Sequence, residues 1–413
     1  MEKATRKKVT EAGNRGEKVR SDCHVQIETG TGKGLVIDLR SKVNSMFGRH
    51  IRALVSKQMN FYNLTDARVQ ITDSGALDFV IMARLEAAVQ KISSTSQKFL
   101  PEMLTQNLYS TGPERFRLSR LYLPGNSPAL MLNAGIHKPN GIILDLEDSV
   151  APEKKTEARL LVRNALRALD FYGAERMVRI NPLPLGAEDL KEVIPNNVHV
   201  ILIPKAEDPD QITEVDTLVD KIPVKHNTGQ SVYFMPILET AKGIENAYSI
   251  AMSSGRIVAM AIGLEDLTAD LGVTRTSEGN ETLWARSRMV NACVAAGIQP
   301  IDSVFSDVSD MEGLLKTVQR SKAMGFEGMG CIHPRQIRAI HEGFAPSPAE
   351  IDKAKRIIKA YDEAREKGLG VVSLGTKMID PPVVQRALHI LELAKAMELE
   401  FLPVTHEKAD NNE

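Results

Sequence analysis

Residues 236–247 read PILETAKGIENA and residues 259–270 read AMAIGLEDLTAD, so two strongly apolar runs each lead directly into acidic residues. The first run ends at Glu239 and the second at Glu265 and Asp266. A carboxylate at the end of an apolar strand is costly unless water, a cation or a hydrogen-bond donor receives it. Because the pattern is repeated, it indicates a site, provided that the other strands of the chain behave alike.

Apolar runs of this kind occur eight times after residue 118, and helical patterns separate them. The clearest helical pattern is TEARLLVRNALRALD at 156–170, where apolar residues recur every three or four positions. The runs are RLYLPG (120–125), GIILDLED (141–148), ERMVRIN (175–181), VHVILIPK (198–205), VYFMPILET (232–240), RIVAMAIGLED (256–266), IQPIDSVF (298–305) and GMGCIHPRQ (328–336). Eight alternating strands and helices within about 230 residues predict an α/β protein with a (β/α)8 TIM barrel. A doubly wound open sheet is the alternative, which the lack of a GxGxxG after the first strand disfavours.

Most of these runs end in polar or charged residues: Asn126, Glu147, Asp148, Arg179, Asn181, Lys205, Glu239, Glu265, Asp266, Asp302 and His333. In a barrel, all carboxyl ends of the strands meet at one mouth, where barrel enzymes keep their chemistry. Crowded carboxylates repel one another unless a cation lies between them, and oxygen ligands favour Mg²⁺ or Mn²⁺ over zinc. A divalent metal beside an arginine suits a developing alkoxide or enolate. The residues expected at the mouth therefore predict a metal-dependent lyase or aldolase that acts on a small oxo- or hydroxy-acid. They do not identify which acid is the substrate.

The chain before the barrel has a different pattern, with strand-like and helical runs but few acids or histidines placed for catalysis. We interpret it as a compact α+β module that binds or carries a group. A stretch rich in Ser, Thr, Gln and Pro then connects it to the barrel. The predicted organisation is a flexible basic tail (1–20), the α+β module (21–92), a linker (93–117), the barrel (118–345), and a C-terminal helical cap and tail (346–413).

Composition limits the classes of partner and compartment. A net charge of -1 over 413 residues gives no reason to expect nucleic acid or an acidic membrane as a partner. Cys23, Cys293 and Cys331 are far apart, which indicates a reducing compartment rather than a disulfide framework. The N-terminus lacks the apolar core of a signal peptide, and no stretch approaches the roughly 20 apolar residues of a membrane span. We therefore expect a cytoplasmic protein.

The ordered motifs of the barrel region resemble the citrate lyase β-subunit family of the HpcH/HpaI aldolase/citrate lyase superfamily. They are RLYLPGNSPALMLNAG, GIILDLEDSVAPEKKTEARLLVRNALR, MVRIN, ILIPK, ILETAKGIENA, IGLEDLTAD, GCIHPRQI and KMIDPPVV, spread over residues 118–395. The resemblance implies a (β/α)8 barrel that uses Mg²⁺ to cleave a carbon–carbon bond, assembled as a homo-oligomer, often a trimer.

The same resemblance implies roles for individual residues. Glu239 and Asp266 would be the metal ligands, Arg179 the substrate-binding arginine, Tyr122 and Asp302 thioester contacts, Glu147 and Asp148 holders of water around the metal, and Asp380 the general acid. Core packing is an equally good interpretation of Tyr122, and a salt bridge from Arg179 to Glu147 or Asp148 would not exclude its role. For Lys205 and His333 we expect structural hydrogen bonding.

Asp380 lies in KMIDPPVV at 377–384, after an apolar pair and before two prolines that fix the backbone. In the family, the matching aspartate comes from a neighbouring subunit, so the oligomer would assemble the site. The alternative interpretation is an exposed aspartate in a loop.

The N-terminal module resembles the citrate lyase acyl carrier (γ) subunit through SDCHVQIE (21–28), GRHIRALVSKQ (48–58) and DSGALDFVIMARLEAA (73–88). In that family a serine near the N-terminus carries phosphoribosyl-dephospho-coenzyme A, and Ser21 is the candidate here. Arg20 departs from the small or acidic residue that the family prefers at a neighbouring position. A separate citrate lyase α-type transferase subunit would have to load the arm.

Together these features predict a fused acyl carrier and lyase that cleaves a citryl thioester, citryl-ACP or citryl-CoA, to an acetyl thioester and oxaloacetate. The nearest alternative is a malyl-CoA or citramalyl-CoA lyase with an unmodified module. A non-catalytic carrier or assembly subunit is a third possibility, which the intact acidic mouth disfavours. A pyruvate-type aldolase barrel also uses a Glu and Asp pair on a metal, but it would not need a thioester-binding module.

Overall fold

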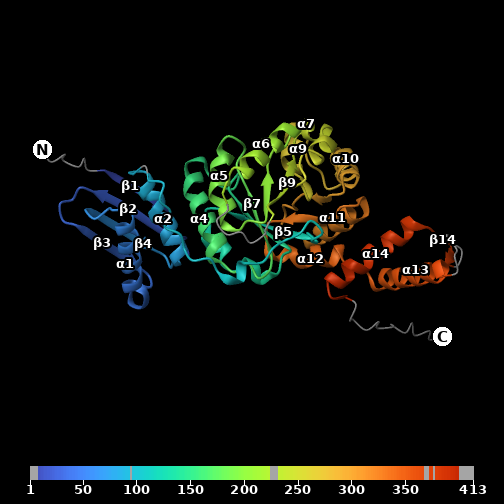
Figure 1. The fold of residues 1–413 in the computed structure, drawn as a ribbon, viewed down its shortest axis with the longest axis horizontal. Coiled ribbons are helices and arrows are strands. Elements are labelled where there is room, and N and C mark those ends of the chain that lie inside the picture. The colour runs from blue at the N-terminus through green and yellow to red at the C-terminus, as the bar shows by residue number, and fades with distance from the viewer. Residues whose placement is uncertain (1–7, 94, 224–230, 367–371, 375–376, 400–413) are drawn as a thin grey trace. The chain divides into compact units, whose positions relative to one another are not determined.

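The computed structural model describes residues 8–93, 95–223, 231–366, 372–374 and 377–399. The chain divides into two compact units, Met1–Arg338 and Ala339–Glu413. Figure 1 shows the first unit as a small N-terminal sheet with two helices followed by a barrel, and the second as a group of helices at the C-terminal end.

The N-terminal module is a four-stranded sheet in the order β1-β2-β4-β3. Its elements are β1 (Val9–Gly13), β2 (Cys23–Thr29), β3 (Leu35–Ser41), α1 (Asn44–Phe61), β4 (Ala67–Asp73) and α2 (Asp78–Gln90). Strand β4 alternates buried and exposed residues, with Val69 and Ile71 buried, as a sheet with one covered face requires. This is the α+β module that the sequence predicts.

The flexible tail expected over residues 1–20 is wrong in part, because Val9–Gly13 forms the edge strand β1, antiparallel to β2. Backbone hydrogen bonds to β2 hold this strand in place, and they do not depend on which side chains it carries. The short sequence VTEAG therefore carries no regular alternation of apolar and polar residues that would have revealed the strand.

Eight parallel strands close into a barrel in the order β5-β6-β7-β8-β9-β10-β11-β12. They are β5 (Ser119–Pro124), β6 (Gly141–Asp145), β7 (Glu175–Arg179), β8 (Val200–Ile203), β9 (Tyr233–Leu238), β10 (Ala259–Ile262), β11 (Gln299–Asp302) and β12 (Gly328–Cys331). Every strand coincides with one of the eight apolar runs. The closed barrel confirms the predicted fold class and excludes the open sheet.

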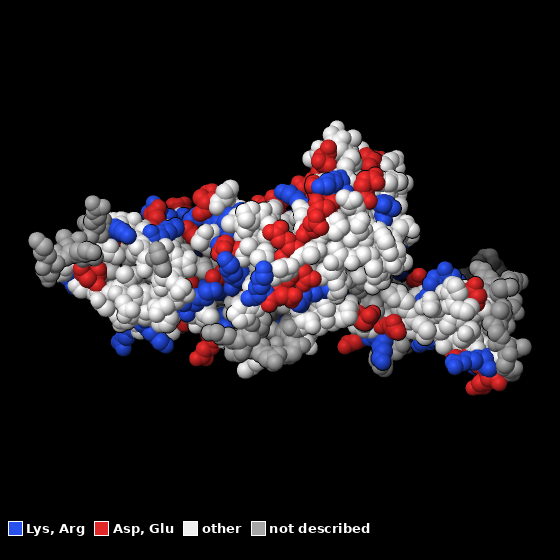
Figure 2. Space-filling model, turned by 45° about the horizontal axis from the view of Figure 1, so that its top comes forward, with Lys and Arg blue, Asp and Glu red and all other residues white. Residues whose placement is uncertain are grey.

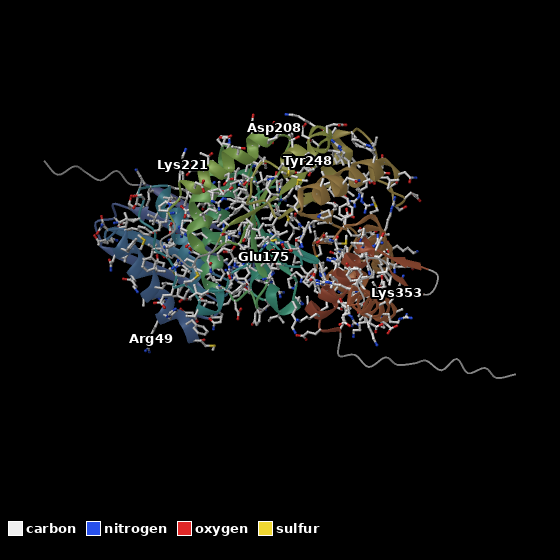
Figure 3. All side chains as sticks on the ribbon, turned by 45° about the vertical axis from the view of Figure 1, so that its right-hand side comes forward. Arg49, Glu175, Asp208, Lys221, Tyr248 and Lys353 are labelled. Atoms are coloured by element: carbon white, nitrogen blue, oxygen red, sulfur yellow. The ribbon has the colours of Figure 1, made fainter. Side chains whose placement is uncertain are left out.

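Helices follow the strands, as Figure 1 shows. They are α3 (Pro128–Met131), α4 (Lys155–Ala168), α5 (Leu185–Val193), α6 (Pro209–Asp220), α7 (Ala241–Glu245), α8 (Ala247–Ala251), α9 (Leu264–Asp270), α10 (Asn280–Ala296), α11 (Met311–Met324) and α12 (Pro334–Phe344). Inside the barrel, buried apolar side chains such as Met177, Leu202 and Met235 form the core. Glu175, labelled in Figure 3, is the first residue of β7 and forms a fully buried ion pair with Arg117 at 2.8 Å.

The N-terminal module packs on the barrel through α2 and α4. Arg163 on α4 binds both carboxylate oxygens of Glu86 on α2, at 2.8 and 2.9 Å, and neither side chain is exposed. The stretch expected to be a linker (93–117) is itself fastened to the barrel: Asn107 is fully buried, and its amide donates to the carbonyl of Leu169 at 2.5 Å. The module and the barrel therefore belong to one compact unit.

The C-terminal unit contains α13 (Pro348–Glu366), a hairpin of β13 (Val372–Leu374) and β14 (Lys377–Ile379), and α14 (Pro381–Ala396). Its small core packs Ala354 and Ile357 of α13 against Ile379 and Ala387. This matches the helical cap that the sequence predicts after the barrel. Among the described helices of the whole chain, none has the length and apolar character to cross a membrane.

Candidate active site

A cavity of about 810 Å³ lies at the carboxyl ends of the barrel strands. It brings together six of the predicted site residues: Tyr122, Asp148, Arg179, Glu239, Asp266 and Asp302. His333, for which we expected only structural hydrogen bonding, lines it as well. Their elements are far apart in the sequence, and the parallel closure of the barrel brings them together.

On the face of the molecule that Figure 2 presents, acidic and basic side chains intermingle, in keeping with the net charge of -1.

Glu239 follows the last residue of β9 and is only 2% exposed. Its Oε1 accepts a 2.7 Å hydrogen bond from the backbone N–H of Lys205, and its carboxylate also interacts with that of Asp266. Burial, together with the negative charge of Asp266, raises the pKa of Glu239 to about 8. Two carboxylates this close are stable only if a proton or a cation lies between them.

Asp266 does not lie at the end of β10, as the sequence suggested, but in the first turn of α9. The bend from β10 into α9 occurs at Gly263, where a Cβ atom would lie 2.7 Å from Oε2 of Glu239. Only a residue without a side chain lets the backbone pass this close to the carboxylate. The neighbouring Glu265 also lines the cavity, but its carboxylate binds Arg275 at 2.5 Å.

The donor set of this pair fits a small hard cation. Within the described residues, no group of three or more His, Cys, Asp or Glu side chains has a metal-binding arrangement, so the protein would supply the two carboxylates alone. Mg²⁺ is typically bound by one or two carboxylates and keeps several waters or substrate oxygens. A softer metal such as zinc is usually bound through at least one nitrogen or sulfur ligand.

Arg179, the last residue of β7, is held from the neighbouring strand β6. Its Nε and Nη2 donate to the two oxygens of Asp145 at 2.7 and 2.8 Å. Although burial opposes ionisation of Asp145, the bonds to Arg179 outweigh it and keep the pKa of Asp145 below its usual value. Sequence reasoning did not single out Asp145, because Glu147 and Asp148 follow it immediately in GIILDLED.

Glu147, Asp148 and Lys205 form a second charged group beside Arg179. Nη1 of Arg179 lies 3.1 Å from Glu147, and Nζ of Lys205 lies 3.1 Å from the same carboxylate. Asp148 is within 4 Å of both cations and is half exposed. The salt bridges considered for Arg179 exist, and they leave its bidentate bond to Asp145 intact.

Tyr122, Asp302 and His333 line the cavity in different ways. The Cζ atom of Arg179 lies 5.5 Å from the centre of the Tyr122 ring. The carboxylate of Asp302 is already engaged by the N–H of Ser303, the hydroxyl of Ser321 and the guanidinium of Arg286. The Nδ1 atom of His333 accepts from the backbone N–H of Arg335 at 3.1 Å, which is structural hydrogen bonding of the kind expected.

Asp380 belongs to the C-terminal unit, where it caps helix α14. Its Oδ1 accepts a 3.1 Å hydrogen bond from the backbone N–H of Val383, three residues on. Pro381 and Pro382 occupy the first turn, where a missing N–H costs nothing. The aspartate therefore has a structural function within its own unit, in addition to any catalytic one.

Ser21 lies at the end of the loop between β1 and β2, next to a buried ion pair. Its φ is +52°, an uncommon conformation for a residue with a side chain, and the residue is half-buried. The adjacent Asp22 binds Arg84 of α2 at 2.8 Å, and Arg84 also donates to the carbonyl of Asn126 in the loop after β5. The candidate attachment residue is thus connected through Asp22 and Arg84 to the barrel.

Comparisons with known proteins agree with these features. Residues 118–334 match the family described as HpcH/HpaI aldolase/citrate lyase, and residues 13–92 match the one described as malonate decarboxylase delta subunit (MdcD). The citrate lyase subunit beta of Haemophilus influenzae is 40% identical over 68% of this chain and 98% of its own length. Human mitochondrial citramalyl-CoA lyase is 33% identical over 68% of this chain and 86% of its own length.

Among solved structures, protein CitE from Mycobacterium tuberculosis, in complex with magnesium, acetoacetate and coenzyme A, superposes with a TM-score of 0.57. It is 30% identical and covers 68% of this chain and 98% of its own. The segment that matches the family, residues 118–334, contains the whole barrel with Arg179, Glu239 and Asp266. The resemblance drawn from the motifs is confirmed: this chain belongs to the HpcH/HpaI aldolase/citrate lyase family.

Proposed function

We propose that the chain is a magnesium-dependent carbon–carbon lyase that cleaves a citryl thioester to an acetyl thioester and oxaloacetate, and that its N-terminal module is an acyl carrier. The observation that carries the proposal is the facing pair of Glu239 and Asp266 beside Arg179. It occurs in a chain that is 40% identical to a citrate lyase subunit beta over nearly all of that protein. The CitE structure solved with magnesium and coenzyme A supports the metal and the thioester.

In this proposal each residue has a defined part. Glu239 and Asp266 hold Mg²⁺, which, when bound, polarises the substrate hydroxyl and lowers its pKa. Arg179, fixed by Asp145, binds the adjacent carboxylate and stabilises negative charge. As the hydroxyl gives up its proton to solvent water, the carbon–carbon bond breaks, and its electron pair moves to the thioester side as an enolate. Asp380, supplied by a neighbouring subunit, then donates a proton to the enolate carbon.

The metal assignment is tested with Glu239→Gln and Asp266→Asn, each measured for Mg²⁺ affinity by calorimetry and for thioester cleavage. Both variants should lose cleavage and bind Mg²⁺ more weakly. Glu265→Gln is a matched control, because Glu265 is adjacent in sequence but is bound to Arg275. Unchanged Mg²⁺ affinity in both ligand variants would disprove the assignment.

The carrier assignment is tested by the mass of the protein. If Ser21 carries phosphoribosyl-dephospho-coenzyme A, the chain purified from its native host is heavier than its sequence by that arm, and the Ser21→Ala chain is not. A separate α-type transferase subunit would load the arm, and the assembly would be a cytoplasmic homo-oligomer, such as a trimer. Unmodified native protein would contradict the carrier assignment and leave the barrel chemistry untouched.

A second candidate function is cleavage of free citramalyl-CoA or malyl-CoA with an unmodified module. The 33% identity to human citramalyl-CoA lyase favours it, because that relative also matches 68% of this chain. Assays of the three coenzyme A thioesters on the unmodified chain distinguish the candidates. Turnover of citramalyl-CoA or malyl-CoA in preference to citryl-CoA would support the second.

A further inference from the structure

Arg120 is a buried cation at the inner end of the cavity. It lies on β5 two residues before Tyr122, so both side chains point to the interior of the barrel. Only 1% of Arg120 is exposed to solvent, yet it lines the cavity together with Ile237 and Ala261. Ile237 and Ala261 belong to the apolar core inside the barrel, as does Met235.

Among the residues that the structure describes, Arg120 has no negatively charged partner. Its Nη1 lies 2.9 Å from the sulfur of Met235, its Nη2 lies 3.4 Å from the carbonyl oxygen of Asp302, and its Nε has no hydrogen-bond partner. In the part of the chain that the structure describes, Arg120 forms no salt bridge. Three other fully buried arginines each pair with a carboxylate: Arg84 with Asp22, Arg117 with Glu175, and Arg163 with Glu86.

An unpaired buried guanidinium has a large desolvation cost that a thioether and one long carbonyl contact do not offset. Burial lowers the pKa of Arg120 to about 10, so the group is still a cation at neutral pH. Because the side chain faces a cavity of substrate size, the missing anion can come from a ligand. Guanidinium and carboxylate match in geometry and charge, which makes a carboxylate the natural counterion.

The substrates of the proposed reaction differ in one group. In each, the reacting carbon carries a hydroxyl, a carboxylate, a CH₂–CO–S thioester arm and a variable group, which is a hydrogen in malyl, a methyl in citramalyl and a CH₂–COO⁻ in citryl thioesters. Glu239, Asp266 and Arg179 account for the hydroxyl and the shared carboxylate. The extra carboxylate of the citryl group still requires a cation, and Arg120 lines the same cavity.

We propose that Arg120 binds the carboxylate of the variable group and thereby selects tricarboxylic acyl thioesters over their methyl and hydrogen analogues. This inference rests on the proposed lyase function and specifies its substrate class. For the keto-acid product, the same contact favours the dicarboxylate oxaloacetate over pyruvate.

The test is calorimetric binding of oxaloacetate and of pyruvate to the full chain in the presence of Mg²⁺. The wild type should bind oxaloacetate more tightly than pyruvate. Arg120→Met should weaken oxaloacetate binding about 10- to 100-fold, the value of a hydrogen bond to a charged group, and leave pyruvate binding unchanged. Arg120→Lys keeps the charge and should recover part of the difference.

Arg176→Met is the matched control, because Arg176 is also fully buried, has no carboxylate partner in the described part of the chain, and does not line the cavity. It should leave the ratio of the two affinities unchanged. The proposal would be overturned if the wild type bound oxaloacetate and pyruvate equally. It would also be overturned if Arg120→Met kept the wild-type ratio of the two affinities, or weakened the binding of both acids equally.

Kinetics separate this inference from the proposed function. The ratio of kcat/KM for citryl-CoA to that for citramalyl-CoA should fall in Arg120→Met. If the wild type cleaves citryl-CoA and the ratio is unchanged in the variant, only the assignment of Arg120 fails. If the wild type prefers oxaloacetate through Arg120 but cleaves no thioester, the anion site stands and the lyase function fails.

Discussion

Asp145 holds Arg179 by two parallel hydrogen bonds of 2.7 and 2.8 Å that run between the ends of adjacent strands β6 and β7. The bond fixes the plane of the guanidinium at the mouth of the barrel, beside the pair formed by Glu239 and Asp266. A bidentate arginine–carboxylate pair of this kind orients as well as stabilises. The orientation of the substrate-binding group is therefore set by a residue that need not touch the substrate.

Asp145→Asn should lower kcat/KM for thioester cleavage by about 100-fold, because a small misplacement of a positioning group can cost that much. Mg²⁺ affinity should be unchanged, since Asp145 is not a proposed ligand. Steady-state kinetics and calorimetry measure the two quantities. Asp216→Asn is the control: Asp216 binds Arg256 at 2.8 Å, outside the cavity, and its variant should keep full kcat/KM. Equal losses in the two variants would refute the positioning role.

Asp380 provides a test that separates catalysis from helix capping. Asparagine caps a helix as well as aspartate does, whereas alanine loses about 1 kcal/mol. Asp380→Asn should therefore keep the unfolding free energy but lower kcat at least 100-fold if the carboxyl group donates the proton. Asp380→Ala should show both losses. A nearly normal kcat in Asp380→Asn would leave Asp380 with its capping role alone.

Sharing of the site between subunits is tested by mixing. A chain with Asp380→Asn and a chain with Arg179→Met are each expected to be inactive. In mixed oligomers, some sites would combine the intact barrel of the first with the intact Asp380 of the second, so that part of the activity returns. An inactive mixture that has demonstrably exchanged subunits would argue for an acid from the same chain.

The free energy of unfolding of the unit Met1–Arg338 should depend on pH through His199. This residue is fully buried and immediately precedes β8. Its Nδ1 accepts from the N–H of Arg176 and its Nε2 donates to the carbonyl of Tyr109 at 2.9 Å, so the ring is held neutral. Burial, reinforced by the nearby positive charges of Arg176, Arg115 and Arg117, lowers the pKa of His199 to about 3.

An unfolded chain binds a proton at this histidine below a pH of about 6.5, and the folded chain does not until about pH 3. Stability is therefore lost as the pH falls through this window, by about 2 kcal/mol between pH 7 and pH 5. Urea unfolding at several pH values measures the slope. His199→Asn, which cannot titrate, should show a smaller slope, and an unchanged slope would contradict the assignment.

The buried pair of Arg163 and Glu86 is expected to behave differently from surface pairs. Arg163→Met leaves Glu86 as an unpaired buried charge and should cost about 3–5 kcal/mol of unfolding free energy. The double variant Arg163→Met, Glu86→Met should recover much of that loss, because neither charge remains. Lys316→Met, in an exposed pair with Glu312, should change stability by less than about 1 kcal/mol. Similar losses in the single and double variants would contradict this account.

The sequence predicted the barrel and much of its mouth because the relevant signals are local. Each apolar run contains a strand. Arg179 and Glu239 stand where their strands end, and Asp266 follows β10 in the first turn of α9. Asp145 and Arg120 were missed for a different reason: both lie within strand runs, and their importance depends on what faces them from other strands. Arg120 is notable only because no carboxylate faces it, which a linear sequence cannot display.

The same limit applies to the N-terminal module. Its helices and three of its strands have clear periodicity, whereas β1 is held by pairing with β2. The stretch interpreted as a linker has the composition of one, yet Asn107 and Tyr109 bond to the barrel. Backbone carbonyls that receive such bonds leave no trace in the side-chain pattern.

The interface of α2 with α4 has a consequence for transport of a bound group. Carrier domains that shuttle between enzymes must detach repeatedly, and detachment here would expose the Glu86–Arg163 pair and break the bond from Arg84 to Asn126. These contacts anchor the N-terminal module to the barrel. Any movement of a thioester held at Ser21 would therefore have to come from the length of its prosthetic arm. For the same reason, cleavage of the peptide chain between residues 95 and 104 would leave the N-terminal module bound to the barrel.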